Sequence, residues 1–329
     1  MKIRKNVLRL GLPLLAAGLL AGCGTSPAER MNRADQAYGE NRYAEARLDY
    51  TSVLKEEPGN IAVMDKLVRT FLALEDPVAA KGMLDRMASE GYLPKDAPVL
   101  YGDVALMEGL FNDALSRVEG MRTAEAYRVA ALGHIGNQSP QMAEDAFILG
   151  RNAPGSKGRL LSAYAAFKLG IGQLDDARKL AVLAAKEEPV PLSAMLINAD
   201  IARSDGRKKE ALTWFERAQK TFPDSRTALL GRIGILGELD RLEEVRPLVE
   251  TARKQRPGDP DFIYLEAALK AEDGKWKDVR DILQPIERDL EQLPQSNALY
   301  AKAMLELGHG ELARARLTSQ LLREPHNDV

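Results

Sequence analysis

The chain has 329 residues, of which 45% are hydrophobic and only 5% are aromatic, and its formal net charge at pH 7 is −2. Ala, Leu, Glu, Lys and Arg dominate, and no long run of alternating β-branched residues occurs, so the composition predicts an all-α protein. Residues 1–22 contain four basic residues and no acidic one, which leaves 46 − 4 = 42 basic against 48 acidic side chains, a net charge of −6. This balance argues against binding to nucleic acid.

The first 22 residues have the plan of a targeting segment. Basic residues precede the apolar run Leu10–Leu20, which is too short to span a bilayer as a helix. The run ends in Leu20-Ala21-Gly22-Cys23, which resembles the lipobox of bacterial lipoproteins. This resemblance implies cleavage before Cys23 and lipidation of its thiol and its new amino group. Cys23 is the only cysteine, so it has no disulfide partner within the chain. The alternative is an ordinary cleaved signal peptide with a chance cysteine.

Gly24, rather than Asp, follows the cysteine, which under the sorting rule familiar from enteric bacteria implies the outer membrane. More than one acyl chain makes such an anchor stable, because each buried methylene contributes about 0.8 kcal/mol. We therefore expect a signal peptide at residues 1–22, a lipidated tether at 23–29 and a periplasm-facing domain at 30–327.

The rest of the chain is organised around a small residue that recurs at a fixed period. Seven of the eight intervals are 34 residues long, and one, between Ala114 and Ala143, is 29 residues long. The recurring residues are Ala46, Ala80, Ala114, Ala143, Ala177, Ala211, Val245, Val279 and Ala313. A period of this length indicates a repeat protein whose units stack on one another.

Each unit is predicted to contain a first helix (helix A), a turn and a second helix (helix B). The turn is expected to need a left-handed residue, which explains why glycine is frequent there. The turn positions are Asn41, Glu75, Gly109, Gln138, Gly172, Gly206, Asp240, Gly274 and Gly308. The small residue of helix B is expected where the two helices cross closely. A proline twelve residues later ends helix B in five units, because proline cannot continue a helix.

Four residues beyond each small residue lies a position expected in the core. Its occupants are Tyr50, Leu84, Val118, Phe147, Ala181, Phe215, Val249, Leu283 and Leu317. Of the two tryptophans, Trp276 is expected in the core between units, and Trp214 is expected to be partly exposed on the outer face.

This plan resembles the tetratricopeptide repeat (TPR) over roughly residues 27–327, although no unit has the tryptophan typical of early helix A. The resemblance implies a right-handed solenoid of about nine helix-turn-helix units. The units are expected near residues 30–60, 61–94, 95–123, 124–157, 158–191, 192–225, 226–259, 260–293 and 294–327.

Two units depart from the plan. The short interval ends unit three early, and Gly120 lies where its helix B should be strongest, so a truncated helix B is predicted there. In unit eight, Pro285 and Pro294 predict a helix B that is bent and then stopped.

Nothing in the sequence predicts catalysis, a cofactor or a metal site. The histidines His134, His309 and His326 are isolated from one another, whereas a metal site needs convergent ligands. Gly231–Gly237, GRIGILG, has glycines but lies inside a predicted helix with no preceding strand, so a phosphate-binding loop is disfavoured.

The TPR resemblance implies that helix A lines a concave groove that binds protein partners. Carrying the repeat phase along the chain gives the candidate groove residues Asp35, Tyr38, Arg69, Leu72, Asp103, Leu106, Met107, Arg128, Leu132, Ile135, Leu196, Asp200 and Arg203. Apolar side chains mixed with Asp and Arg suit an amphipathic helix or an extended segment docking by its apolar face. The alternative is that many of these residues simply pack against the neighbouring unit.

Three kinds of bacterial TPR lipoprotein share this plan: pilotins and pilus-assembly lipoproteins, lipoproteins of exopolysaccharide export and protein sorting, and adaptors of peptidoglycan hydrolases. The opening RADQAYGENRYAEARLDYTSVLKEEPGN looks most like the first two kinds. The resemblance thus implies a scaffold for periplasmic or outer-membrane protein partners. An enzyme, a small-ligand binder and a cytoplasmic co-chaperone are the alternatives.

Overall fold

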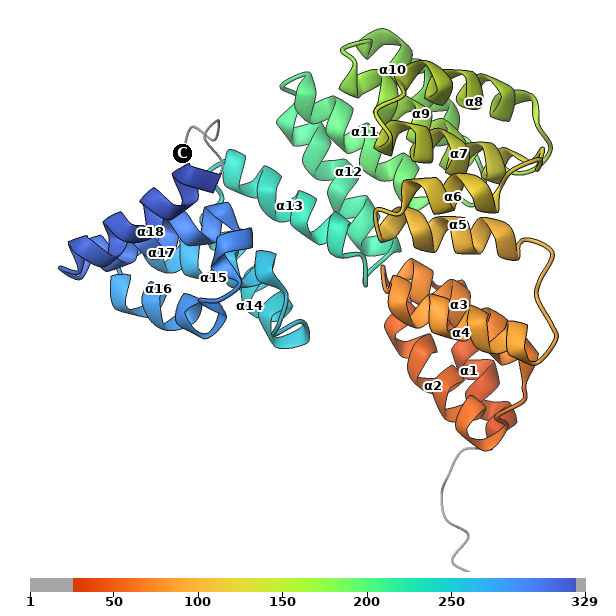
Figure 1. The fold of residues 1–329 in the computed structure, drawn as a ribbon, viewed down its shortest axis with the longest axis horizontal. Helices are drawn as coiled ribbons and strands as arrows, with labels where there is room; N and C mark the ends of the chain where they lie inside the picture. The colour runs from red at the N-terminus through yellow and green to blue at the C-terminus, as the bar shows by residue number, and fades with distance from the viewer. Residues whose placement is uncertain (1–25, 324–329) are drawn as a thin grey trace, which may run out of the picture.

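The computed structural model describes residues 26–323, which fold into eighteen α-helices and two short 3-10 helices, with no strand in that range (Figure 1). The predicted signal peptide, Cys23 and His326 lie outside the described residues. The prediction of an all-α solenoid of helix-turn-helix units is confirmed.

Odd-numbered helices are the A helices and even-numbered helices the B helices of successive units. The A helices are α1 (Pro27–Gly39), α3 (Ile61–Ala73), α5 (Ala97–Met107), α7 (Ala124–Gly136), α9 (Gly158–Gly170), α11 (Leu192–Ser204), α13 (Arg226–Glu238), α15 (Pro260–Glu272) and α17 (Pro294–Glu306). The B helices are α2 (Tyr43–Glu56), α4 (Pro77–Ser89), α6 (Phe111–Arg117), α8 (Pro140–Asn152), α10 (Leu174–Ala184), α12 (Lys208–Thr221), α14 (Leu242–Gln255), α16 (Trp276–Leu283) and α18 (Gly310–Arg323).

Helix α1 begins three residues before the predicted start of the array. Ser26 is its N-cap: the Ser26 hydroxyl accepts from the Glu29 amide, and the Glu29 carboxylate accepts from the Ser26 amide, which forms a capping box. The last three residues of the segment predicted as a tether are therefore helical.

The turn between helices A and B is left-handed in every unit. All nine predicted turn residues have positive φ, from 55° at Gln138 to 86° at Gly308. Four of them are not glycine, so those turns place a side chain in a conformation that L-residues rarely adopt. Tight turns of this kind keep helices A and B of a unit antiparallel and in contact.

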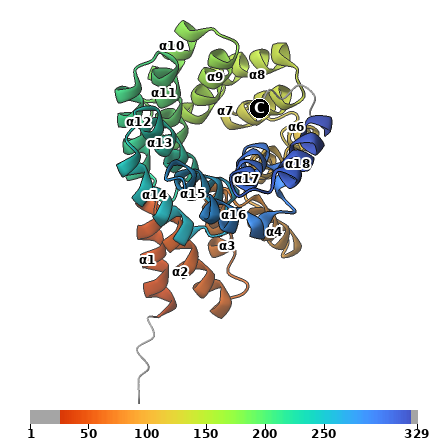
Figure 2. The ribbon, with the colours of Figure 1, turned by 90° about the vertical axis from the view of Figure 1, so that its left-hand side faces the viewer.

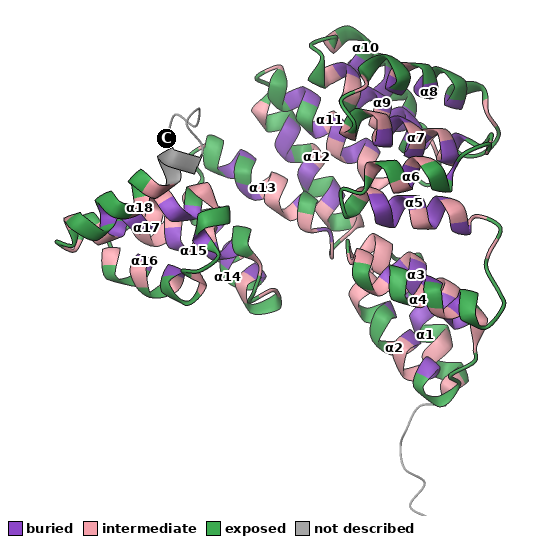
Figure 3. Cartoon of the chain, viewed as in Figure 1, coloured by how far each residue is buried: buried purple, intermediate pink, exposed green. Residues whose placement is uncertain are grey.

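The core lies where helices A and B face each other (Figure 3). All nine recurring small residues are buried, as predicted. Eight of the nine core positions that follow them are also buried; the prediction was wrong for Leu317, which is 36% exposed. Leu317 lies on α18, and no described helix follows α18 to cover it. Trp214 and Trp276 are both partly buried against neighbouring cores.

The two irregular units differ from the rest in helix B. Helix α6 of unit three has seven residues, against 13 in α8 of the next unit, which confirms the predicted truncation. In unit eight, α16 ends at Leu283, and the chain continues through the 3-10 helices Gln284–Ile286 and Leu290–Gln292 to α17. Pro285 thus bends the segment away from an α-helix, and Pro294 begins the next helix instead of ending this one.

The units wind into a superhelix. In Figure 2, α9, α13 and α17 lie on the inner side and α10, α14 and α18 on the outer side. The winding brings the first two units beside the connection between α12 and α13 (Figure 1). There the Asp224 carboxylate accepts from the Ala44 amide at 2.8 Å, and the Thr227 hydroxyl donates to the Glu75 carboxylate at 3.0 Å. These contacts join residues 180 and 152 positions apart in the sequence.

Candidate partner-binding groove

An ion pair that skips one unit identifies the concave side. Arg159 of α9 contacts Asp103 of α5 at 3.0 Å, although α7 lies between these helices in the sequence. Units n and n + 2 approach each other only on the inside of a curved stack, where the helix axes converge. The face of helix A that carries Asp103 therefore lines the concavity, and the candidates Asp35, Arg69, Leu132 and Asp200 hold the same repeat phase as Asp103.

Four charged residues form a network on this face in units three to five. Arg128 lies between Asp103 and Glu125, with N–O distances of 2.5 and 2.7 Å, and Arg159 contacts the same two carboxylates at 3.0 Å each. Asp103 and Arg128 are only 5% and 4% exposed. Burial alone would raise the pKa of the Asp103 carboxyl, but the Arg128 and Arg159 guanidinium groups outweigh it and lower that pKa.

The charges of Asp103 and Arg128 are thus satisfied by partners within the chain. That these two residues contact a partner stays a prediction, and their observed contacts are structural. The exposed member of the network is Arg159, whose side chain is about half exposed.

In units one to three, the other predicted charged residues are also paired. Asp35 accepts from the Tyr50 hydroxyl at 2.6 Å and forms an ion pair with Lys66 of the next A helix. Arg69 makes two hydrogen bonds to Asp65 on its own helix and two to Asp96 just before α5. These pairs fix the relative positions of neighbouring A helices.

The apolar groove residues form a row with one member per unit. Its members, in the same repeat phase through units one to five, are Tyr38, Leu72, Leu106, Ile135 and Leu169. Ile135 is 37% exposed, and Met107, beside Leu106, is 45% exposed. Tyr38, Leu72, Leu106 and Leu169 are partly buried against the cores of their own and neighbouring units, and Leu132, one turn before Ile135, is also partly buried. The concave face of units one to five is therefore an apolar strip beside fixed ion pairs.

The three candidates in unit six lie in different surroundings. Leu196 is partly buried, whereas Asp200 and Arg203 are exposed. Arg203 donates to Glu238 of α13 at 2.5 Å. Although Asp200 is exposed, partial desolvation of its carboxyl by the surrounding protein raises its pKa, and the charge of Arg203 only partly opposes this.

Two openings mark the irregular units. A cavity of about 550 Å³ lies where helix α6 stops early, between Leu115–Arg122 and the face of α7 that carries Tyr127, Ala130 and His134. Burial lowers the pKa of the His134 imidazole, which favours its neutral form. The missing turns of helix B thus leave part of α7 uncovered at the unit that the sequence marks by its short interval.

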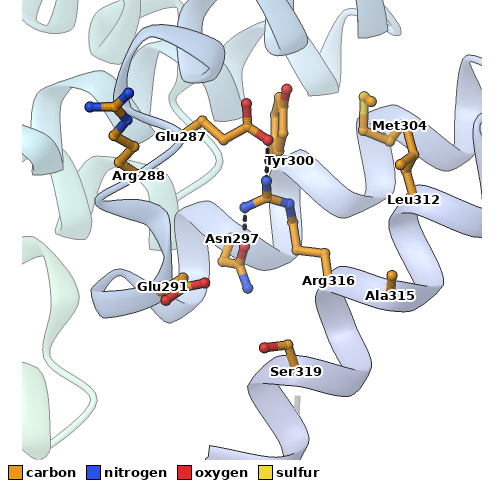
Figure 4. A pocket seen from close by; sticks show the side chains of 10 residues that line it. All are labelled: Glu287, Arg288, Glu291, Asn297, Tyr300, Met304, Leu312, Ala315, Arg316 and Ser319. Carbon is orange, nitrogen blue, oxygen red and sulfur yellow. Dashed lines mark hydrogen bonds and ion pairs between the residues drawn. The ribbon is translucent and has the colours of Figure 1, made fainter.

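The second opening, of about 410 Å³, lies between the 3-10 segment of unit eight and helices α17 and α18 (Figure 4). Arg316 crosses it, paired with Glu287, hydrogen bonded to Asn297 at 3.1 Å and stacked over the Tyr300 ring at 4.9 Å. The Arg316 guanidinium group thus links α18 to α17 and to Glu287, which lies in the segment that replaces the end of helix B.

Among residues 26–323, no group of three or more His, Cys, Asp or Glu side chains is placed to hold a metal ion. Within the same range, no helix combines the length and the apolar character that crossing a membrane requires.

The tetratricopeptide-repeat family matches residues 168–226, which cover the end of α9 through the start of α13. The Cut9–Hcn1 hetero-tetramer of the APC/C superposes on 89% of this chain with a TM-score of 0.52 and 9% sequence identity. The fold is that of a TPR solenoid. This chain spans 55% of the Cut9–Hcn1 chain that it matches.

Two further solved structures are similar to the TPR array. The human IFIT1 dimer with PPP-AAAA matches 91% of this chain and 83% of its own, with 15% identity and a TM-score of 0.50. Pseudomonas aeruginosa PilF matches 64% of this chain and 96% of its own, with 15% identity and a TM-score of 0.49. At these identities the likeness concerns the fold alone. No curated protein matches the sequence.

Sequence reasoning missed the residues that pair with the groove charges. Glu125 and Arg159 are one repeat period of 34 residues apart and form an ion pair with each other. Their equivalent positions in successive units could have predicted that pair. The contact of Asp224 with Ala44 has no such signal, because it depends on how far the superhelix has turned after five units.

Proposed function

We propose that this protein is a lipid-anchored scaffold in the periplasm that binds protein partners through its concave groove during assembly of a cell-envelope machine. The observation that carries the proposal is the apolar row of Tyr38, Leu72, Leu106, Ile135 and Leu169, which repeats once per unit on the concave face. The TPR fold supports protein–protein interaction, and the L-A-G-C segment ending at Cys23 supports lipid anchoring.

The spacing of this row suits an α-helical partner segment. Neighbouring packed helices lie about 8–10 Å apart, so Leu106, Ile135 and Leu169, on the successively packed helices α5, α7 and α9, are separated by a similar distance. Residues seven positions apart on an α-helix are about 10 Å apart, because each residue rises 1.5 Å. A partner helix with an apolar residue in every heptad can therefore contact one groove residue per unit in units three to five.

The mechanism is passive and needs no catalytic group. Acyl chains on Cys23 would hold the groove at the inner leaflet of the outer membrane, which raises the effective concentration of the groove for partners at the same membrane. The envelope machine is a pilus or secretion system or an exopolysaccharide exporter, and a peptidoglycan hydrolase is the alternative partner.

The test is crosslinking in living cells followed by mass spectrometry, comparing the wild type with Met107→Glu/Ile135→Glu. Both side chains are exposed, so the substitutions place charge on the groove without opening the core. Ile148→Glu/Val182→Glu is the matched control, because these two apolar residues are at least as exposed but lie on B helices. Loss of partners in the groove variant alone is expected; equal loss or equal retention in both variants contradicts the groove as the binding site.

The anchor has its own test. Labelled palmitate is expected to enter the wild type but not Cys23→Ser, and the variant is expected to leave the membrane fraction. Identical fractionation of the two proteins, with no label in either, would contradict the anchor while leaving the groove untouched. The identity of the crosslinked partner separates pilus, export and hydrolase systems.

A further inference from the structure

We propose that the groove between α11 and α13 accepts a basic side chain, Lys or Arg, of the partner segment, with Asp200 as its counter-charge. This inference rests on the proposed function, because it concerns the chemistry of a partner that binds the same concave face. It identifies the partner segment as a basic amphipathic one.

Asp200 differs from the other candidate carboxylates of the groove in having no counter-charge in contact. Asp35 is paired with Lys66, and Asp103 is paired with Arg128 and Arg159. Across the part of the chain that the structure describes, Asp200 forms no hydrogen bond and no ion pair. The nearest cation in the sequence, Arg203, already donates to Glu238 on α13.

The concave face is open around Asp200. Helix α5 packs directly on α7, α7 on α9 and α9 on α11, but comparable packing joins neither α11 with α13 nor α13 with α15 in the described residues. The positions in the same phase as Asp200 one unit away are small, Ala166 and Gly234. A Cβ atom added at Gly234 or at Gly237 would meet nothing within 4 Å, so a side chain from a partner has room there.

Apolar side chains flank this position along the groove. Leu196 precedes Asp200 by one helical turn, Leu230 holds the same phase as Leu196 on α13, and both are partly buried. A cation whose aliphatic stem lies on these leucines would bring its charged end to Asp200.

The electrostatics favour a cation over other occupants. Asp200 is exposed, but the protein around it still removes part of the water from its carboxyl and raises its pKa, so the charged form is less stabilised than in a free aspartate. An ammonium or guanidinium group in contact would restore that stabilisation, whereas an anionic or purely apolar segment would not.

The first experiment uses the mature protein purified in detergent and two fluorescein-labelled helical peptides of about two heptads. One peptide contains Leu and Lys, and the other has Gln in place of Lys. Wild type is expected to prefer the Leu/Lys peptide, and Asp200→Asn is expected to weaken binding of that peptide about tenfold while leaving the Leu/Gln peptide unchanged. Glu243→Gln, on the exposed B helix α14, is the matched control and is expected to change neither affinity.

Asp200→Asn keeps the shape of the side chain and removes an unpaired charge, so it is expected to fold normally, as circular dichroism would verify. Equal affinity of wild type and Asp200→Asn for the Leu/Lys peptide, or no preference of wild type for Lys over Gln, would overturn the inference.

The second experiment separates this inference from the proposed function. Asp200→Lys and Glu243→Lys enter the crosslinking assay beside Met107→Glu/Ile135→Glu. Loss of partners with Asp200→Lys but not with Glu243→Lys supports the inference. Partners kept by Asp200→Lys but lost by the Met107/Ile135 variant overturn the inference and leave the groove function standing. Partners kept by both overturn both.

Discussion

Units three to five and units six to eight use the same repeat to build opposite kinds of concave surface. In the first region, α5, α7 and α9 pack directly on one another and bury the ion network of Asp103 and Arg128. In the second region, α11, α13 and α15 lack such packing, and the inner positions carry Gly234, Gly237 and an unpaired Asp200. In the first surface the charged groups pair with one another, whereas the second surface has open space and a carboxylate without a paired cation.

The length of helix B does not by itself account for the difference. Helix α6 has seven residues and α10 has 11, and α5 packs on α7 and α9 on α11. Yet α7 also packs on α9 across α8, which has 13 residues, whereas the 14-residue helices α12 and α14 lie between A helices that lack such packing. The contacts between A helices, rather than the lengths of the B helices, therefore define the two regions.

The largest expected effect comes from breaking the buried network. Arg128→Met leaves the buried Asp103 without its closest cation, so we expect a loss of about 3–5 kcal/mol in the free energy of unfolding. Arg203→Met removes an ion pair whose arginine is half exposed, and we expect a loss below about 1 kcal/mol. Urea denaturation of both variants at pH 7 gives the comparison.

Amide hydrogen exchange shows where the loss falls. Protection is expected to drop in α5, α7 and α9 for Arg128→Met and to change little elsewhere. Similar losses for the two variants would mean that the network adds nothing beyond a surface ion pair.

The second prediction contrasts two glycines of A helices, one in each region. A Cβ atom at Gly136 of α7 would lie 2.3 Å from the Phe111 ring, so Gly136→Ala is expected to cost about 1–3 kcal/mol. A Cβ atom at Gly234 of α13 would meet nothing within 4 Å, so Gly234→Ala is expected to stabilise by about 1 kcal/mol through helix propensity. Thermal or urea unfolding measures both, and equal signs would contradict the difference in packing.

Much of the fold could be predicted from the sequence because the same pattern of a turn residue and a small residue in helix B occurs in all nine units. The small residue of helix B is buried in every unit, and each predicted turn residue has positive φ, even where it is Asn41 or Glu75. These features depend on contacts within one unit, so the sequence of that unit suffices to predict them.

The candidate site was less predictable because it depends on contacts between units. Repeat phase placed Asp103 and Asp200 at equivalent positions, yet one is buried between two arginines and the other is exposed and unpaired. The packing of neighbouring A helices, which is present around Asp103 and lacking between α11 and α13, accompanies these outcomes, and it depends on contacts between units that no single unit's sequence contains. The lipid anchor at Cys23 stays a prediction, since Cys23 lies outside the described residues.

The third prediction uses the opposite pKa shifts of these two aspartates. The pKa of Asp103 is lowered in the folded protein, so its contribution to stability is present above the unfolded pKa of about 3.9 and is lost as the pH falls through the folded value. The pKa of Asp200 is raised, so its contribution is present below about pH 3.9 and is lost as the pH rises through the folded value.

The free energy of unfolding, measured at pH 7 and near pH 3, tests the direction of both pKa shifts. Asp103→Asn is expected to lose most relative to wild type at pH 7, with a smaller difference in acid. Asp200→Asn is expected to match or slightly exceed wild type at pH 7 and to lose any advantage in acid. Titration of the two carboxyl carbons by NMR assigns the shifts to the residues, and the same direction for both would contradict the comparison.

The smallest effect is expected where the two ends of the first superhelical turn meet. Helix α2 has no side-chain cap of its own at Arg42, and Asp224 supplies one from unit six by accepting from the Ala44 amide. A carboxylate at a helix N-terminus is favourable, but this hydrogen bond and the one from Thr227 to Glu75 contribute only about 1 kcal/mol each. No larger packing surface between helices joins these units in the described range.

Asp224→Ala/Glu75→Ala is therefore expected to leave the cores intact while allowing units one and two to move away from unit six. Small-angle X-ray scattering should then show longer interatomic distances than wild type, whereas Glu243→Ala should leave the distribution unchanged. An unaltered distribution in the double variant would mean that stacking between consecutive units alone sets the closure of the superhelix.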